Sequence, residues 1–228
     1  MHYVLITGVL IFLVYFPTLW VRFVMRRHSK EISDMPGTGG ELAEHLLQRF
    51  DLSDFVVERT AEGGDHFDSS CKAVRLSPAN YSGKSLTAVA VAAHEVGHAL
   101  QYHNKERIFE LRSRYIPLAL VLKKAGILIV TAVPVVALVF KAPVVILLFV
   151  IVGAGLQLLG ALSYLIVLPE EWDASFNKAL PILTQGEYIH SNHVPAVRSV
   201  LKAAALTYFA GALADIVNLG RWLMVLRR

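Results

Sequence analysis

Two long apolar runs in the middle of the chain constrain its fold more than any other feature. Residues 116–140 and 143–168 consist mostly of apolar side chains, and only Lys141 and Ala142 lie between them. Each run exceeds the roughly 20 residues that a helix needs to cross a bilayer. A backbone in lipid must satisfy its own hydrogen bonds, so each crossing has to be helical. We therefore predict a transmembrane hairpin over residues 116–168 with a tight external turn.

Two further apolar segments lie at the ends of the chain, at residues 1–25 and 205–228. Hydrophobic residues make up 55% of the chain and charged residues only 18%, which is too apolar for an ordinary soluble domain. We therefore predict a mainly α integral membrane protein with about four transmembrane helices. Within the last helix, Asp215 is costly in lipid and is expected to pair with Asn218 or Arg221.

Basic residues flank the first apolar segment on its C-terminal side. Because cytoplasmic loops carry an excess of lysine and arginine, this end is predicted to be cytoplasmic and the N-terminus to lie outside. The cluster comprises Arg22, Arg26, Arg27, His28 and Lys30.

Residues 26–115 form the main polar segment. A helix is predicted over residues 41–50, and short strands over residues 55–58 and 72–76, with turns between the strands. A small sheet of this kind could bind an extended peptide at its edge. Three turn residues could hold a second cation, although a solvated turn is the favoured interpretation: Asp65, His66 and Asp68.

The motif HEVGH at residues 94–98 lies in a proline-free stretch that predicts a helix over residues 85–102, with Ser85 as its N-cap. On a helix, side chains four residues apart share a face, so His94 and His98 point at one place. Glu95 lies about 100° around the helix, where it can reach a water on the ion without binding the ion. This is the arrangement of zinc peptidases, with two ligands and one general base.

A catalytic zinc needs a third protein ligand. A third histidine spaced as in the long metzincin motif would fall at Asn104, which excludes that class. A glutamate from a later helix fits better, and the two crossings of the hairpin return residues 169–175 to the same face of the membrane as the motif. The candidates are Glu170, Glu171, Asp173, His103, His190 and His193.

Composition also excludes several classes of function. Cys71 is the only cysteine, so the chain has neither an intrachain disulfide nor a cysteine-based zinc site. No basic tract is interleaved with aromatic residues, so nucleic acid is not an expected partner.

Several segments of the sequence together resemble the YugP-type neutral zinc metallopeptidases of bacterial membranes. They cover nearly the whole chain and include the HEVGH motif and an L-P-x-E-[FW]-D-A-S element: residues 65–68, 74–78, 85–98, 168–175 and 203–208. The resemblance implies that zinc is the metal and that Glu171, before the aromatic residue, is the third ligand beside His94 and His98. It also implies a gluzincin-like α+β domain, formed by residues 26–115 and completed by residues 169–204.

The same region is similar to the HtpX-like membrane metalloproteases, in which a Glu-x-x-Ala-Asp element supplies the third ligand. Alignment on Ala174 again selects Glu171 and places Ser175 where those enzymes have aspartate. The supporting carboxylate is then absent or is supplied by Asp173. Those enzymes have a histidine and an arginine after the third ligand, which implies His193 and Arg198 as candidates for stabilising the oxyanion. His190 and Tyr208 are further candidates, and a surface histidine and a helix-capping arginine are the alternatives.

The leading hypothesis is a multi-pass zinc endopeptidase of the bacterial inner membrane, with its site at the cytoplasmic surface. Zinc would activate water and polarise the scissile carbonyl, while Glu95 would transfer the proton to the leaving amine. Its partners would be peptide or protein substrates and the lipid bilayer, and an oligomer or a regulatory membrane partner is compatible with this hypothesis. The alternatives are an intramembrane site-2-type protease and a membrane scaffold or adaptor with a structural metal site.

Overall fold

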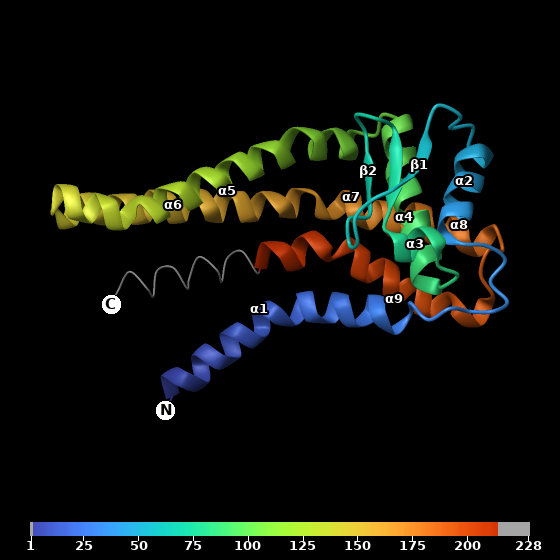
Figure 1. Cartoon of the computed structure of the whole chain (residues 1–228), viewed down its shortest axis with the longest axis horizontal. Coiled ribbons are helices and arrows are strands. Elements are labelled where there is room, and N and C mark those ends of the chain that lie inside the picture. The colour runs from blue at the N-terminus through green and yellow to red at the C-terminus, as the bar shows by residue number, and fades with distance from the viewer. Residues whose placement is uncertain (1, 214–228) are drawn as a thin grey trace. The chain divides into compact units, whose positions relative to one another are not determined.

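A computed structural model describes residues 2–213 of the chain, which are mostly helical (Figure 1). The chain divides into two compact units, a helical hairpin unit and a unit that carries the HEVGH helix. Of the described residues, the first comprises 2–18, 111–168 and 208–213, and the second comprises 19–110 and 169–207. Helix α1 (His2–Arg27) contributes to both.

The hairpin unit is built on α5 (Arg107–Phe140) and α6 (Pro143–Ser163), joined at Lys141 and Ala142. This confirms the predicted pair of helices and its tight turn, although α5 begins at Arg107 rather than at residue 116. Glycines bring the two helices close together. A Cβ added at Gly126 would lie 2.7 Å from the carbonyl oxygen of Gly153, as expected where helices pack in lipid through small residues.

Among the described residues, two helical stretches are long and apolar enough to cross a membrane, Arg107–Phe140 and Pro143–Gln185. A pair of helices bent by 45°, Ser191–Ala205 and Thr207–Leu213, would make a third if it acts as one span. The prediction of four crossings is thus supported for the hairpin, and a crossing by α1 stays a prediction. The predicted pairing of Asp215 with Asn218 or Arg221 lies outside the described residues.

The other unit contains a three-stranded sheet of strand order β1-β3-β2. Strand β3 (Ala73–Leu76) pairs in parallel with β1 (Val56–Arg59) and antiparallel with β2 (His66–Asp68). Strand β2 is a correction, because the sequence predicts only turns between the strands at residues 55–58 and 72–76. Tertiary packing overrides the turn residues there: Phe67 is buried and its ring stacks on Phe55, with centroids 5.8 Å apart.

The three residues considered for a second cation have protein partners instead. Asp65 accepts hydrogen bonds from the backbone and hydroxyl of Ser77, and Asp68 accepts from Ser70 and Arg75. His66 pairs with the carbonyl of Gly64. These carboxylates therefore stabilise the sheet and its connections.

Helix α4 (Leu86–His103) is the centre of this unit, and Ser85 caps its N-terminus as predicted by accepting a hydrogen bond from the amide of Ala88. Nearly the whole length of α4 is buried, because the small residues of its sequence let neighbours approach on every side. Elements that pack on it include α2 (Gly39–Arg49), α3 (Pro78–Ser82), α8 (Leu180–Gln185), α9 (Val194–Ala205) and the π-helical segment Asp173–Ala179.

Candidate metal centre

Helix α4 places the two imidazoles of the motif side by side. His94 and His98 are 4% and 2% exposed, and their Nε2 atoms lie 3.2 Å apart. The four-residue spacing produces this geometry, because one helical turn brings both side chains to the same face. Two nitrogen ligands are therefore fixed by a single rigid element.

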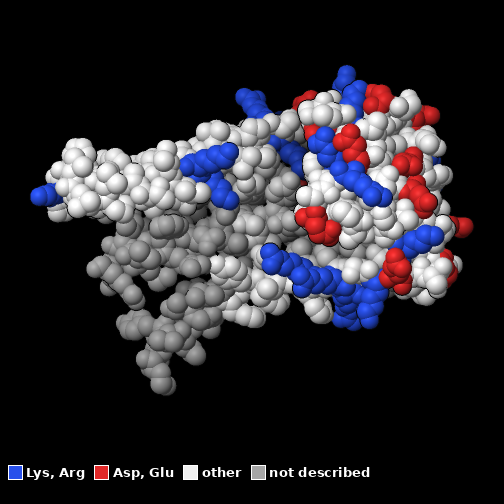
Figure 2. Space-filling model, viewed as in Figure 1, with Lys and Arg blue, Asp and Glu red and all other residues white. Residues whose placement is uncertain are grey.

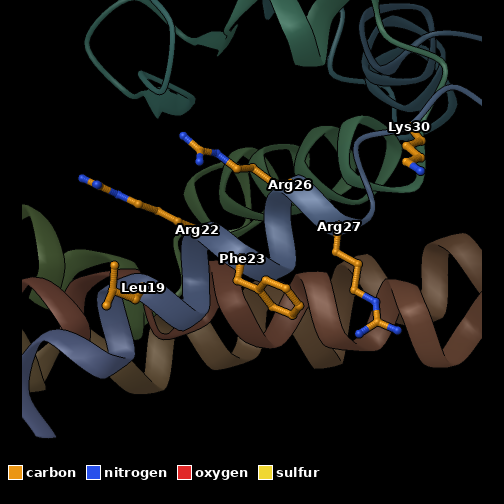
Figure 3. Close-up of a pocket in the computed structure, with 6 residues that line it drawn as sticks. All are labelled: Leu19, Arg22, Phe23, Arg26, Arg27 and Lys30. Atoms are coloured by element: carbon orange, nitrogen blue, oxygen red, sulfur yellow. The ribbon is translucent and has the colours of Figure 1, made fainter. Parts of the chain in front are cut away.

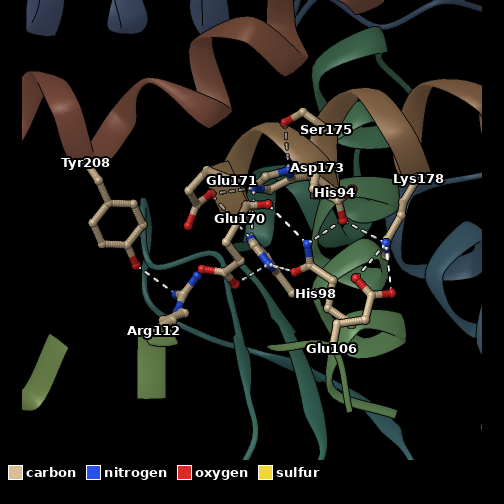
Figure 4. Close-up of polar contacts among 11 residues, drawn as sticks. His94, His98, Glu106, Arg112, Glu170, Glu171, Asp173, Ser175, Lys178 and Tyr208 are labelled. Atoms are coloured by element: carbon tan, nitrogen blue, oxygen red, sulfur yellow. Dashed lines mark hydrogen bonds and ion pairs between the residues drawn. The ribbon is translucent and has the colours of Figure 1, made fainter. Parts of the chain in front are cut away.

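A third ligand atom comes from α7 (Leu168–Trp172), which follows the hairpin in the chain. The Oε2 atom of Glu171 lies 3.2 Å from His94 Nε2 and 3.4 Å from His98 Nε2 (Figure 4). Ligand atoms bound tetrahedrally to zinc at about 2.0–2.1 Å lie about 3.3 Å from one another, so this triangle fits a zinc ion. Within residues 2–213 it is the one group of three or more His, Cys, Asp or Glu residues whose ligand atoms are close enough to share an ion. All three residues are buried.

The other predicted candidates for the third ligand lie elsewhere. His103 is exposed at the end of α4, and His190 is exposed with its Nε2 3.9 Å from Asp34 Oδ2. Asp173 accepts hydrogen bonds from Gln101 and Lys178. Glu170 is fully buried, but it contacts the far side of the His98 ring, with its Oε1 3.0 Å from Nδ1.

Ser175 determines which ring nitrogen of His94 carries the proton. Its hydroxyl donates to the carbonyl oxygen of Leu201 at 3.1 Å and lies 3.0 Å from Nδ1 of His94. Since a hydroxyl has only one proton, its oxygen accepts from the imidazole, and the His94 proton is on Nδ1. The lone pair of Nε2 then faces the ligand triangle, so serine performs at this position the orienting role that a second carboxylate often has.

His98 is oriented by a larger polar network. Its Nδ1 lies 2.9 Å from Oε1 of Gln101 and 3.0 Å from the Glu170 carboxylate, and both of these oxygens can accept a hydrogen bond from Nδ1. Burial disfavours a charged imidazole, but the carboxylates of Glu171 and Glu170 outweigh burial and raise the pKa of His98 well above its ordinary value. The site therefore favours positive charge at this point.

A close contact between backbones brings the third ligand to the motif. A Cβ added at Gly97, inside HEVGH, would lie 2.9 Å from the carbonyl oxygen of Ala174. Ala174 lies in the π-helical segment Asp173–Ala179, a type of helix that is rare and is found often at functional sites. Glu171 and Ser175 flank this contact, and together they meet both nitrogens of His94.

The remaining predicted site residues are placed as follows. Glu95 is buried on α4 beside His94. His193 is half-buried at the N-cap of α9, and Arg198 is exposed further along α9. Neither is joined to the ligand triangle by a contact within the described residues, and their roles stay predictions. The hydroxyl of Tyr208 accepts a hydrogen bond from Arg112 at 2.8 Å.

Sequence reasoning missed the supporting roles of Gln101 and Glu170. Gln101 follows His98 by three residues and therefore lies on the same face of the helix. A polar side chain at that spacing within a buried helix was the available signal.

Comparison with known proteins agrees with this centre. The family described as "Putative neutral zinc metallopeptidase" matches residues 3–227, and the chain belongs to this family. "Putative membrane protease YugP" of Bacillus subtilis (strain 168) is 33% identical over 215 residues, which cover 91% of each chain. No solved structure matches. The resemblance inferred from the sequence motifs is confirmed, and zinc is the metal that the family description implies.

Proposed function

We propose that the protein is a membrane-embedded, zinc-dependent endopeptidase. The observation that carries the proposal is the buried triangle of His94, His98 and Glu171, whose spacing suits one tetrahedral ion. Ser175 holds the Nδ1 proton of His94, and Gln101 with Glu170 holds that of His98, so Nε2 is the atom of each imidazole that faces this point and would bind the ion.

Zinc at this position would supply an acidified water and would polarise the scissile carbonyl. Glu95 would take the proton from the attacking water and deliver it to the amine that leaves. Stabilising the oxyanion requires a hydrogen-bond donor, and His193 and Arg198 remain the proposed residues. Substrate would be an extended peptide or protein segment.

The number of protein ligands favours catalysis over a structural metal site. Structural zinc is closed by four protein ligands, whereas the group found within residues 2–213 has three. An intramembrane site is less well supported, because α4 is not among the described helices that qualify as spans.

The catalytic proposal is tested with the full-length protein in detergent, supplied with zinc, on casein. Glu95→Gln keeps the side-chain volume but cannot take a proton, so hydrolysis is expected to fall about 10²–10⁴-fold. Zinc content is expected to stay at the wild-type value, whereas Glu171→Gln is expected to lower it. Undiminished hydrolysis by Glu95→Gln would contradict the proposed general base.

The proposed orientation places the catalytic unit, which is the unit of residues 19–110 and 169–207, in the cytoplasm. Basic side chains surround the C-terminal end of α1, where they line a pocket with Leu19 and Phe23 (Figure 3). Such residues favour the cytoplasmic face. The pocket's cations are Arg22, Arg26, Arg27 and Lys30.

Cys71 offers a direct test of orientation, because it is the chain's only cysteine and is exposed on the catalytic unit. A membrane-impermeant maleimide is expected to label it in permeabilised spheroplasts and not in intact ones. Cys71→Ser is the matched control. Labelling in intact spheroplasts would place the site outside the cell.

A further inference from the structure

Gln101 is a fully buried side chain that connects a metal-binding imidazole to a chain of charged groups. We propose that Gln101, Asp173 and Lys178 are positioning residues, which hold His98 and the third-ligand segment in the geometry that binds the metal. The inference deepens the proposed function and rests on it, since it assigns these residues to the same centre.

The orientation of the Gln101 amide is fixed by its partners. Its Nε2 donates to the carbonyl oxygen of Glu170 at 3.1 Å and to Oδ2 of Asp173 at 2.9 Å. Neither oxygen can donate in return, so the nitrogen must face them and Oε1 must face Nδ1 of His98. The Gln101 side chain therefore accepts a hydrogen bond from Nδ1 of His98 and donates hydrogen bonds to Glu170 and Asp173, which lie on either side of Glu171 in the sequence.

Lys178 closes this connection into a ring. Its Nζ lies 2.7 Å from Asp173 Oδ2 and 3.0 Å from Glu106 Oε1 (Figure 4). Glu106 follows α4, and its backbone amide donates to the carbonyl oxygen of Gln101 at 2.9 Å. The ring thus leaves α4 through the Gln101 side chain and returns to it through Glu106.

The ring of contacts explains how Glu171 is held near His94 and His98 although it is distant from them in the sequence. Glu171 is separated from the motif by the whole hairpin, so nearness in sequence cannot place its carboxylate. Two polar connections instead attach the π-helical segment to the C-terminal end of α4, one from Gln101 to Asp173 and one from Lys178 to Glu106. Both connections are made between protein atoms.

The test is a measurement of zinc affinity on the full-length protein in detergent, by competition with a chromophoric chelator. Gln101→Leu removes all three amide contacts at similar volume, and the dissociation constant for zinc is expected to rise about 10–100-fold, as is typical for residues that support ligands. The visible absorption of the cobalt-substituted protein is expected to change as well, because the ligand field depends on how His98 is held.

A second variant covers the case in which Gln101→Leu does not fold. Lys178→Met breaks only the outer connection, and a smaller weakening of zinc affinity is expected, which Lys178→Arg is expected to restore in large part. Asp54→Asn is the matched control, because it breaks the Asp54–Lys72 ion pair on the exposed surface of the same unit and is expected to leave affinity and spectrum unchanged.

The outcomes separate this inference from the proposed function. If the wild-type protein binds no zinc, the proposed function is wrong. If the wild type binds zinc and the folded variants among Gln101→Leu and Lys178→Met bind it equally tightly, with an unchanged cobalt spectrum, only the positioning role is wrong.

Discussion

The hairpin unit and the unit that carries the HEVGH helix expose opposite kinds of side chain. On α5 and α6 many large apolar side chains are exposed, and the contact between the helices is made by glycines and other small residues. In the unit that carries the HEVGH helix the apolar side chains form a core, while charged residues of both signs lie on the surface (Figure 2). The difference supports the proposal that the hairpin lies in lipid and the other unit in water, since a large exposed apolar surface marks a membrane or protein contact.

The largest difference between the two units is expected when a charged residue replaces an exposed apolar residue in each of them. Ile151 on α6 is 59% exposed and Val56 on β1 is 48% exposed. Ile151→Lys is expected to cost about 2.5–3.5 kcal/mol of membrane insertion, whereas Val56→Lys is expected to change stability by less than about 0.5 kcal/mol. The measurement is the fraction of protein that resists alkaline extraction from membranes. Equal recovery of both variants would mean that this face of α6 does not contact lipid.

Equivalent steric clashes in the two units sharpen the comparison further. Gly97→Ala places a Cβ 2.9 Å from the Ala174 carbonyl oxygen, and Gly126→Ala places one 2.7 Å from the Gly153 carbonyl oxygen. Overpacking of this kind costs about 1–3 kcal/mol. Only Gly97→Ala is expected to weaken zinc affinity, because it displaces the segment that carries Glu171, whereas Gly126→Ala is expected to lower thermal stability and leave affinity unchanged.

Gly155 provides the control for both substitutions, since a Cβ there meets no atom within 4 Å. Gly155→Ala should resemble the wild type in melting temperature and zinc affinity. A Gly97→Ala protein with wild-type zinc affinity would show that the contact with Ala174 does not position the ligand.

The smallest expected effect is a pH dependence of stability that comes from Asp68 on strand β2. Hydrogen bonds from Ser70, together with the neighbouring Arg75, lower the pKa of Asp68 from 3.8 to about 2. A lowered pKa means that the ionised carboxylate stabilises the fold above the unfolded value of 3.8, and that this contribution is lost as the pH falls toward 2. The melting temperature of the wild type should exceed that of Asp68→Asn near pH 6, and the difference should shrink below pH 4. A difference that is constant with pH would contradict this assignment.

Local features of the sequence predicted the parts of the molecule that depend on local chemistry. The hairpin follows from the length and apolarity of two runs, and α4 follows from its Ser85 cap and its small apolar residues. Strand β2 was missed because three residues between turn signals carry little local preference, and the burial of Phe67 decides their conformation.

The candidate site shows a similar limit. The motif identified His94 and His98, but adjacent glutamates on a helix point about 100° apart, and spacing alone does not say which one faces the ion. The family resemblance selected Glu171, in agreement with the geometry. The support of His98 by Glu170 and Gln101 depends on contacts between distant segments, which a single sequence does not show.

The position of Glu171 after the hairpin has a consequence for biosynthesis. A ribosome completes the two imidazoles of α4 before it begins α5, and it reaches the carboxylate only after both long apolar helices have been made. A growing chain therefore holds an incomplete ligand set while its hairpin is being made. The proposed hydrolytic activity would therefore begin only after both of these helices have been made.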